Sequence, residues 1–327
     1  MQYSDKVYGE LSIEEPVILE IIASATFQRL KNISQAGYFE PFYPGSYYTR
    51  FEHSVGDYYL LKYFQASLEE QIAGLIHDVS HSAFSHCIDY IGTQEGQKKQ
   101  THQDSIFENF VKNSEIPHIL QKYSLDVDFI LDDSHFPLKE TQIPDLCTDR
   151  MDYSLRAGVM HKEIGTKEVQ YFLDNITATE GKWIFKNYES AFWFAEFFSK
   201  ISDVYFSNIE SAVMLSTVGA YLKHGLEKKY ITMHDIYTTD TEVLEKMKPF
   251  HETDAELQLL FERMNNRIPF ENNPKEYTSH VFCKSRVVDP LFFHGTEIKR
   301  VSEENPEWKE KMEQSKKPKE YFLNFAR

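Results

Sequence analysis

The chain has 327 residues, with 35 Lys and Arg against 51 Asp and Glu, a formal net charge of −16 and 41% hydrophobic residues. This composition is typical of a globular protein, and no run approaches the roughly 18 uninterrupted apolar residues of a membrane span. The negative charge disfavours general attraction to nucleic-acid phosphates or to an anionic membrane, so we expect neither as a partner.

The three cysteines are widely spaced and form no CxxC pair. They therefore predict neither a disulfide framework nor a cysteine zinc site, and they suit a reducing compartment. Residues 1–13 carry acidic and polar side chains in place of a basic region followed by an apolar one. We therefore expect no secretion signal and a cytoplasmic protein.

Most of the chain is predicted to be helical, because apolar residues recur three and four positions apart more often than they alternate. Proline is favoured in the first turn of a helix, which supports a helix starting at Pro16. Helices are predicted at Pro16 to Leu30, Ser54 to Phe64, Leu68 to Ile76, Gln103 to Lys112, Asp149 to Gly158 and Glu189 to His224.

Strand signals are few. They are Trp183 to Phe185 and Ser279 to Cys283, with Val287 and Val288 following the second. The segment from Glu303 to Lys319 is rich in Lys and Glu and is predicted to be a solvated helix or a loose end.

The composition shifts near residue 230, where dense apolar sequence gives way to Thr, Asp and Glu. We therefore predict a mainly all-α core at residues 1–230, with small β-hairpins, and a C-terminal accessory region at residues 231–327 that is α or α+β.

Histidines are concentrated early in the chain, since five of the 13 lie between residues 53 and 102. Two of them belong to the string His77-Asp78-Val79-Ser80-His81, which directly follows an apolar helix. A His-Asp pair at the end of a buried helix can offer an imidazole and a carboxylate to one metal ion. This string therefore predicts half of a metal site.

Two further candidates complete the ligand set. They are His53, in Arg50-Phe51-Glu52-His53-Ser54, and Asp149, in Thr148-Asp149-Arg150-Met151-Asp152-Tyr153. Two nitrogen and two carboxylate donors suit Mn, Fe, Ni, Co or Zn better than Ca, which prefers oxygen ligands alone. The competing interpretation is a set of hydrogen-bonded buried histidines and helix-capping aspartates.

These three motifs, in this order, resemble the H…HD…D signature of the HD-domain metal-dependent phosphohydrolases. More narrowly, they are similar to the branch of dNTP triphosphohydrolases that includes the SAM-and-HD-domain enzyme. The resemblance implies an all-α core of five or more helices and metal ligation by His53, His77, Asp78 and Asp149. It also implies hydrolysis by metal-activated water, with Mg as a possible additional ion.

The resemblance also implies roles beside the metal. His81 and His102 match histidines that act on the phosphate, with Asp89 as an orienting partner of one of them. Arg50 and Tyr153 match positions that touch the nucleotide.

Other residues near these motifs have open roles. Arg150 carries a guanidinium that can pair with phosphate oxygens, and His86 either joins the site or faces solvent. Tyr153 could also simply pack, and Asp152 is interpreted as an ion-pair partner in preference to a ligand.

The sequence departs from this branch at two places. Ser80, Ser82 and Ala83 stand where the branch usually has two glycines and a proline. After residue 200, Ser207 and Asn208 stand where the branch often has a His-Lys pair that reaches the triphosphate. The first departure predicts a stiffer or differently shaped loop, and the second predicts a weaker grip on polyphosphate.

The leading hypothesis is therefore a metal-dependent phosphohydrolase for a nucleotide or a related small phosphorylated molecule, with dNTP hydrolysis as one form. The alternatives are a nucleotide- or second-messenger-binding regulator with a vestigial metal site, and a phosphodiesterase. The resemblance and the aromatic content also suggest a homo-oligomer.

Overall fold

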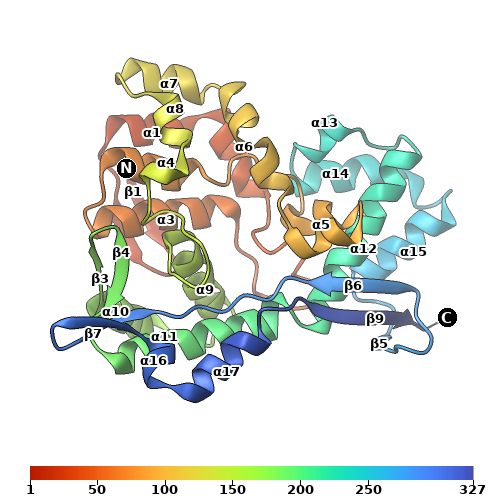
Figure 1. The fold of residues 1–327 in the computed structure, drawn as a ribbon. Coiled ribbons are helices and arrows are strands. Elements are labelled where there is room, and N and C mark those ends of the chain that lie inside the picture. The colour runs from red at the N-terminus through yellow and green to blue at the C-terminus, as the bar shows by residue number, and fades with distance from the viewer. Residues whose placement is uncertain (327) are drawn as a thin grey trace.

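A computed structural model describes residues 1–326 and has a mainly helical architecture with small sheets at its periphery (Figure 1). None of the helices in this part of the chain is long and apolar enough to cross a membrane. The α-helices are α1 (Pro16–Ala23), α2 (Ala25–Gln28), α3 (Arg50–Tyr63), α4 (Leu68–Ile76), α5 (Gln94–Lys99), α6 (His102–Lys112), α7 (Ile116–Lys122), α8 (Val127–Leu131), α9 (Thr148–Met160), α10 (Thr166–Asn175), α11 (Tyr188–Ile201), α12 (Ile209–Glu227), α13 (Met233–Ile236), α14 (Asp240–Met247), α15 (Ala255–Met264), α16 (Val301–Glu304) and α17 (Pro306–Gln314).

Shorter helical turns and nine strands complete the secondary structure of residues 1–326. The 3₁₀ turns are η1 (Arg29–Asn32), η2 (Ser85–Tyr90), η3 (Asp133–His135) and η5 (Lys248–Phe250), and η4 (Ser202–Phe206) is a π-helix. The strands are β1 (Gln2–Asp5), β2 (Gly9–Ser12), β3 (Ile176–Thr179), β4 (Lys182–Phe185), β5 (Phe270–Asn272), β6 (Ser279–Cys283), β7 (Leu291–His294), β8 (Glu297–Arg300) and β9 (Lys319–Phe325).

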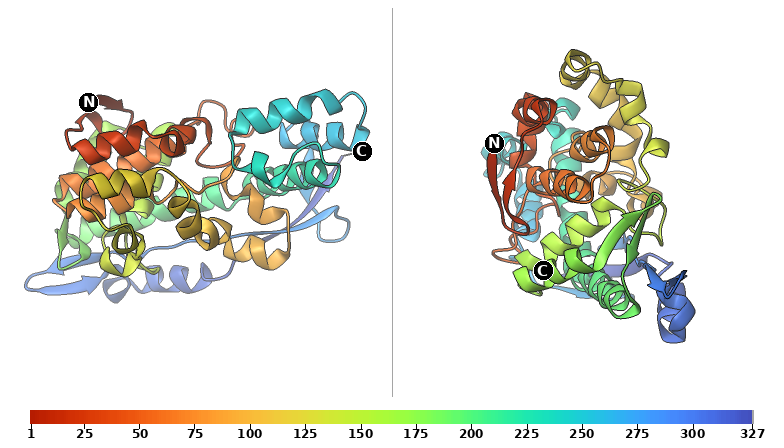
Figure 2. Two further views of the ribbon diagram at one scale, coloured as in Figure 1. Left: turned by 90° about the horizontal axis from the view of Figure 1, so that it is seen from above. Right: turned by 90° about the vertical axis from the view of Figure 1, so that its left-hand side faces the viewer.

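The helices enclose two apolar clusters. The smaller one lies in the N-terminal half, where α1, α3, α4 and α7 contribute its residues. The larger one extends from Val7 to Phe325, so residues from both ends of the chain share it. Figure 2 shows α12 to α15 gathered at one end of the elongated molecule and α1 to α4 at the other.

Two sheets tie the C-terminal residues to the rest of the chain. Strand β4 pairs in parallel with β7, and the four-stranded sheet has the order β3-β4-β7-β8. Strand β9 lies between β5 and β6 in an antiparallel sheet near the other end of the molecule. Figure 1 shows the segment 284–290 crossing the molecule from β6 to β7. That crossing carries residues of the C-terminal region past the N-terminal helices.

The mainly helical character predicted from periodicity is confirmed, and each predicted helix contains helical structure. The run from 189 to 224 is divided into α11, a π-helix and α12, because the Asn208 side chain accepts from the backbone NH of Ser211 and caps a new helix. Strands at Trp183–Phe185 and Ser279–Cys283 are also confirmed, as parts of β4 and β6.

Other details differ from the sequence prediction. Val287 and Val288 are buried in the extended crossing segment but form no strand. The predicted solvated helix is present as α17, yet it is followed by β9, the central strand of its sheet. The boundary near residue 230 remains a prediction.

The close approach of α3 to α9 depends on Gly56. A Cβ added at this position would lie 1.9 Å from Asp152 Oδ1 and 2.4 Å from Arg156 Nη2. Such distances are far inside van der Waals contact, so any larger residue would push the two helices apart. The glycine thereby allows side chains of α3 and α9 to meet in one site.

Candidate metal centre

Helix α3 places His53 in its second turn. The helix starts with a capping box, in which Thr49 accepts from the Glu52 backbone NH while the Glu52 carboxylate accepts from the Thr49 backbone NH. This reciprocal pair fixes the start of the helix and therefore the direction in which His53 projects. The His53 side chain is fully buried between α3 and α9.

Helix α4 ends at the second motif. Ser67 caps its first turn, Ile76 is its last residue, and His77 and Asp78 follow directly. The His77 ring nitrogen Nδ1 lies 2.7 Å from the carbonyl oxygen of Gly74, to which it can donate only as the Nδ1–H form. This contact leaves Nε2 with a free lone pair, and Nε2 has no hydrogen-bond partner among residues 1–326.

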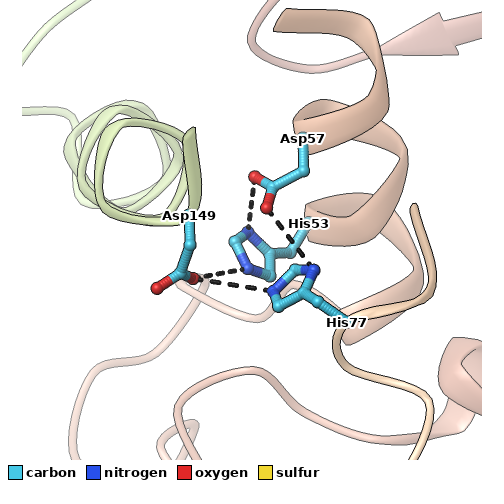
Figure 3. Close-up of side chains that lie close together, drawn as sticks. All are labelled: His53, Asp57, His77 and Asp149. Carbon is cyan, nitrogen blue, oxygen red and sulfur yellow. Dashed lines mark hydrogen bonds and ion pairs between the residues drawn. The ribbon is translucent and has the colours of Figure 1, made fainter. Parts of the chain in front are cut away.

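Asp149 comes from the first turn of α9, where the partial positive charge of the helix terminus favours a carboxylate. Its Oδ1 lies 3.1 Å from His53 Nε2 and 3.7 Å from His77 Nε2 (Figure 3). The Asp78 carboxylate lies 3.6 Å from His53 Nε2 and 3.4 Å from His77 Nε2. The structure therefore brings the four predicted ligands together.

These separations fit a first-row divalent ion. Donors about 2.0–2.2 Å from a shared ion lie about 3–3.5 Å from one another in tetrahedral or octahedral arrangements. The four distances from a carboxylate oxygen to an imidazole Nε2, from 3.1 to 3.7 Å, match this range after a small contraction. The unpartnered Nε2 of His77 is the atom that an ion would engage. We call these four residues the metal cradle.

A second layer of contacts orients the cradle. His53 Nδ1 lies 2.7 Å from Asp152 Oδ2, which leaves Nε2 to face the other cradle residues. Arg156 holds the Asp152 carboxylate through two bonds of 2.9 and 3.0 Å and also pairs with Asp5. The interpretation of Asp152 as an ion-pair partner therefore agrees with its geometry, although the contact to His53 was not foreseen.

The cradle also has a neighbour that the sequence reasoning missed. Asp57, one turn after His53 on α3, is fully buried, and neither of its oxygens has a hydrogen-bond partner in the described chain. Its oxygens lie 3.8 Å from His53 Nδ1 and 3.5 Å from His77 Nδ1, whereas Asp149 faces the two Nε2 atoms. Figure 3 shows Asp57 and Asp149 on opposite sides of the two rings. The i, i+4 spacing from His53 was the available signal.

Neighbouring charges in this region shift the pKa values of the site residues. Burial acts to lower the pKa of His53, but nearby carboxylates, Asp57 first, outweigh it and raise this pKa well above 6.5. Burial acts to raise the pKa of Asp78, but Arg50 and the neighbouring histidines hold it well below 3.8. The Asp78 carboxylate is therefore an anion, as a metal ligand must be.

The predicted catalytic residues divide into two groups. His81 and His86 line the same cavity as His77, Asp78 and Asp149, and His81 Nε2 lies 3.2 Å from Asp78 Oδ1. Asp89 contacts His86, with 3.3 Å between Oδ2 and Nδ1, in place of the partners expected for it.

The His102 side chain is engaged elsewhere. Its Nε2 lies 2.7 Å from the hydroxyl oxygen of Tyr237, and the residue is absent from the described cavity lining. The only contact between His102 and Asp89 runs through the His102 backbone NH, at 3.2 Å. The His102 side chain therefore points to Tyr237 and is not part of the described cavity lining.

The predicted substrate contacts lie in the cavity, which has a volume of about 560 Å³. Arg50 donates to Asp78 at 2.5 Å and to Ser85 at 2.8 Å, so most of its guanidinium is already used. Arg150 donates to Glu140 at 3.0 Å. The hydroxyl of Tyr153 is buried without a hydrogen-bond partner among the described residues, and its ring packs near Phe198 and Phe206.

The residues that replace the family's polyphosphate contacts face other parts of the protein. Ser207 donates to the carbonyl of Ser202 at 2.8 Å, and Asn208 caps α12 and donates to the Tyr43 hydroxyl at 2.5 Å. Neither belongs to the described cavity lining. The geometry therefore agrees with the predicted loss of that grip.

Comparisons with known proteins place this site in a family. No family model matches the sequence. The YdhJ protein of Bacillus subtilis is 36% identical over 294 residues, which cover 90% of this chain and 89% of YdhJ. A metal-dependent phosphohydrolase of Cordyceps militaris, cns2, is 35% identical over 176 residues, covering 53% of this chain and 50% of cns2.

Two more distant comparisons point the same way. The mouse deoxynucleoside triphosphate triphosphohydrolase SAMHD1 is 32% identical over 152 residues, which cover 39% of this chain and 23% of that enzyme. A solved structure of a phosphohydrolase from Bacteroides thetaiotaomicron has the same fold, with a TM-score of 0.76 at 17% identity and complete coverage of both chains. The chain therefore belongs to the HD-domain superfamily of metal-dependent phosphohydrolases, together with YdhJ.

Proposed function

We propose that this protein hydrolyses a phosphate ester or anhydride of a small molecule of the nucleotide class. The observation that carries the proposal is that the carboxylates of Asp78 and Asp149 each lie 3.1 to 3.7 Å from the Nε2 atoms of His53 and His77, three of the four residues lining a cavity. His53, His77, Asp78 and Asp149 would hold a divalent transition metal there. A bound ion of this kind lowers the pKa of a water molecule and neutralises charge on phosphoryl oxygens.

The protein's own residues supply the remaining requirements. His81 and His86 present imidazoles to the cavity, and their ring centroids are 5.0 Å apart. Burial first, and Arg50 with it, lower the pKa of both rings, so each is a neutral imidazole near pH 7. A neutral imidazole can accept a proton from an attacking water, a step that contributes roughly 10²–10⁴-fold. Asp89 orients His86 through its contact with Nδ1.

The cavity supports a substrate of nucleotide size. Its volume of about 560 Å³ lies within the range of roughly 300–1,000 Å³ common for small-molecule sites. Its lining combines aromatic residues, such as Tyr48 and Tyr153, with cationic ones, such as Arg150. This mixture suits a base or other flat group joined to phosphate. A dNTP is one candidate within this class.

A second candidate function is a binding protein without turnover. Its support is that Arg50 and Arg150 are both neutralised by internal carboxylates and that Ser207 and Asn208 face away from the cavity. This alternative predicts that nucleotides raise the melting temperature but are not consumed. A phosphodiester is the third substrate class, and it would be cleaved at the same cradle.

The test is a product screen on purified protein that has been loaded with Mn, Fe, Co, Ni or Zn, with Mg as an additive. Substrates are dNTPs, NTPs, nucleoside monophosphates and bis-p-nitrophenyl phosphate, and the matched variant is His77→Ala, Asp78→Ala. We expect release of phosphate, pyrophosphate or triphosphate by the wild type alone. Binding of nucleotide with no product from any substrate would favour the regulator, and a diester product alone would favour the phosphodiesterase.

A further inference from the structure

The cavity has a cationic wall that comes from the far end of the sequence. The segment that follows β6 brings Lys284 and Arg286 into the lining of the same cavity as the metal cradle. About 200 residues of chain separate these two side chains from His77 and Asp78, and neither belongs to a motif of the sequence analysis. Their presence in the cavity therefore reflects the crossing of segment 284–290 between the two sheets.

These two cations differ from the other cations of the lining. Lys139 and Arg150 each form an ion pair with a carboxylate, to Asp133 and Glu140 respectively. Lys284 and Arg286 form none with any residue between 1 and 326. The Lys284 ammonium donates to the backbone carbonyl of Lys99 at 3.0 Å, and Arg286 Nη2 donates weakly to Gln100 Oε1 at 3.4 Å.

Asp104 and Asp89 lie near enough to act on the charge of Lys284, but no carboxylate among residues 1–326 forms an ion pair with Lys284 or Arg286, which is costly in a partly buried place. Burial first, and then the neighbouring cations Arg286 and Arg150, lower the pKa of Lys284 to about 8, against the opposing effect of Asp104 and Asp89. A folded protein rarely keeps two close, half-buried cations unpaired unless a ligand neutralises them. The missing partner is expected to be an anion.

The neighbours of Arg286 locate that anion relative to the rest of the site. The charge of Arg286 acts on both His86 and Tyr153, since it opposes the rise in the pKa of Tyr153 that burial causes and adds to the lowering of the pKa of His86. Both of these residues line the cavity. An anionic group held by Arg286 would therefore lie in the same cavity as a group at the cradle, within reach of one bound molecule.

We propose that Lys284 and Arg286 form an anion subsite for a second phosphate group of the substrate. The substrate class is then a molecule with at least two phosphates, such as a nucleoside diphosphate or triphosphate or a bisphosphorylated compound. This inference rests on the proposed function, because it assigns the other phosphate to the cradle.

The first experiment measures binding without turnover. Inorganic pyrophosphate and orthophosphate are titrated by calorimetry into the full-length protein and into Lys284→Met, Arg286→Met. The matched control is Lys309→Met, Lys317→Met, which removes two exposed cations outside the described cavity lining. We expect the cavity variant to bind pyrophosphate about tenfold or more weakly than the control, as loss of charge-assisted hydrogen bonds implies, with orthophosphate little changed.

The second experiment separates this inference from the proposed function. If the wild type hydrolyses a diphosphate, the cavity variant should show a KM raised about tenfold and a kcat within about threefold. Lys284→Arg, Arg286→Lys should restore the affinity for pyrophosphate, which rules out a folding defect as the cause. Equal pyrophosphate affinity in the cavity variant and the control would overturn the subsite. If the cavity variant loses affinity for pyrophosphate but the wild type hydrolyses no substrate, only the proposed function would be overturned.

Discussion

The metal cradle and the cationic pair Lys284 and Arg286 lie at the same cavity but differ in how their side chains are paired within the protein. Three of the four members of the metal cradle have partners outside it, as His53 has Asp152, His77 the Gly74 carbonyl and Asp78 Arg50, and Asp149 contacts His53 within it. Among residues 1–326, the hydrogen-bond partners of Lys284 and Arg286 are only a backbone carbonyl and an amide oxygen. The cradle is thus fixed before an ion arrives, whereas the cationic wall is left to be neutralised by a ligand.

This difference in pairing corresponds to different requirements for binding a metal ion and for binding a phosphate group. A metal site needs donors fixed in position, and outer contacts that orient them are worth about 10- to 100-fold in metal affinity. A phosphate subsite needs charge that is still available, so pairing inside the protein would defeat it. On our proposal, the chemistry depends on contacts within α3, α4 and α9, and the choice of substrate depends on the crossing segment.

The largest effect should follow from breaking the cradle. His77→Ala removes an Nε2 that has no other partner among residues 1–326, so metal affinity should fall by more than about 100-fold and hydrolysis with it. The measurement is metal content per chain after dialysis. His118→Ala, an exposed histidine on α7, is the control and should keep wild-type metal content. Retained metal in His77→Ala would contradict the ligand set.

A smaller effect is expected from the orienting layer. Asp152→Asn removes the carboxylate that contacts His53 Nδ1 and one of the two ion-pair partners of Arg156. Metal affinity should therefore fall by about 10- to 100-fold. Competition with a fluorescent chelator measures this change. Asp174→Asn, an exposed substitution on α10, should leave affinity unchanged. An unaltered affinity in Asp152→Asn would show that His53 needs no such partner.

Substitution of Asp57 should have a smaller effect on metal affinity than substitution of Asp152, although both carboxylates lie beside the cradle. Its oxygens are 3.5 Å or more from either ring nitrogen, so Asp57→Asn should lower metal affinity by less than about tenfold, the lower end expected for an orienting hydrogen bond. Because the buried carboxyl lacks a hydrogen-bond partner in the described structure, the unfolding free energy should be unchanged or higher. A loss of metal affinity equal to that of Asp152→Asn would make Asp57 an equal orienting residue.

The smallest effect concerns pH and the cationic wall. With a pKa of about 8, Lys284 is protonated at pH 7 and mostly neutral at pH 9. Arg286 and Arg150 favour the neutral form, and Asp104 and Asp89 oppose them. Pyrophosphate affinity should therefore fall about three- to tenfold from pH 7 to pH 9, relative to Lys284→Met, by calorimetry. A constant ratio between the two proteins would contradict the contribution of the Lys284 charge.

The sequence predicts that His53, His77, Asp78 and Asp149 lie close together because its motifs are local. His77 and Asp78 follow an apolar helix directly, and His53 and Asp149 each begin a recognisable helix, so helix geometry alone restricts where they point. The sequence does not predict the partner of His102, since Tyr237 is 135 residues away.

The other features that sequence reasoning missed are also long-range. Lys284 and Arg286 reach the cavity only because β6 pairs with β9 and β7 pairs with β4. Strand β9 itself follows a Lys- and Glu-rich segment, and its burial between β5 and β6 depends on residues some 40 to 50 positions earlier. Local periodicity carries no information about such pairings.

Anomalous diffraction at the metal absorption edge, from crystals of the Mn-loaded protein, tests most directly whether the cradle binds a metal ion. We predict one strong peak bounded by the Nε2 atoms of His53 and His77 and by the carboxylates of Asp78 and Asp149. A peak on the Nδ1 side of the rings beside Asp57, or one among Glu140, Cys147 and Asp149, which also lie close enough to hold an ion, would contradict the account.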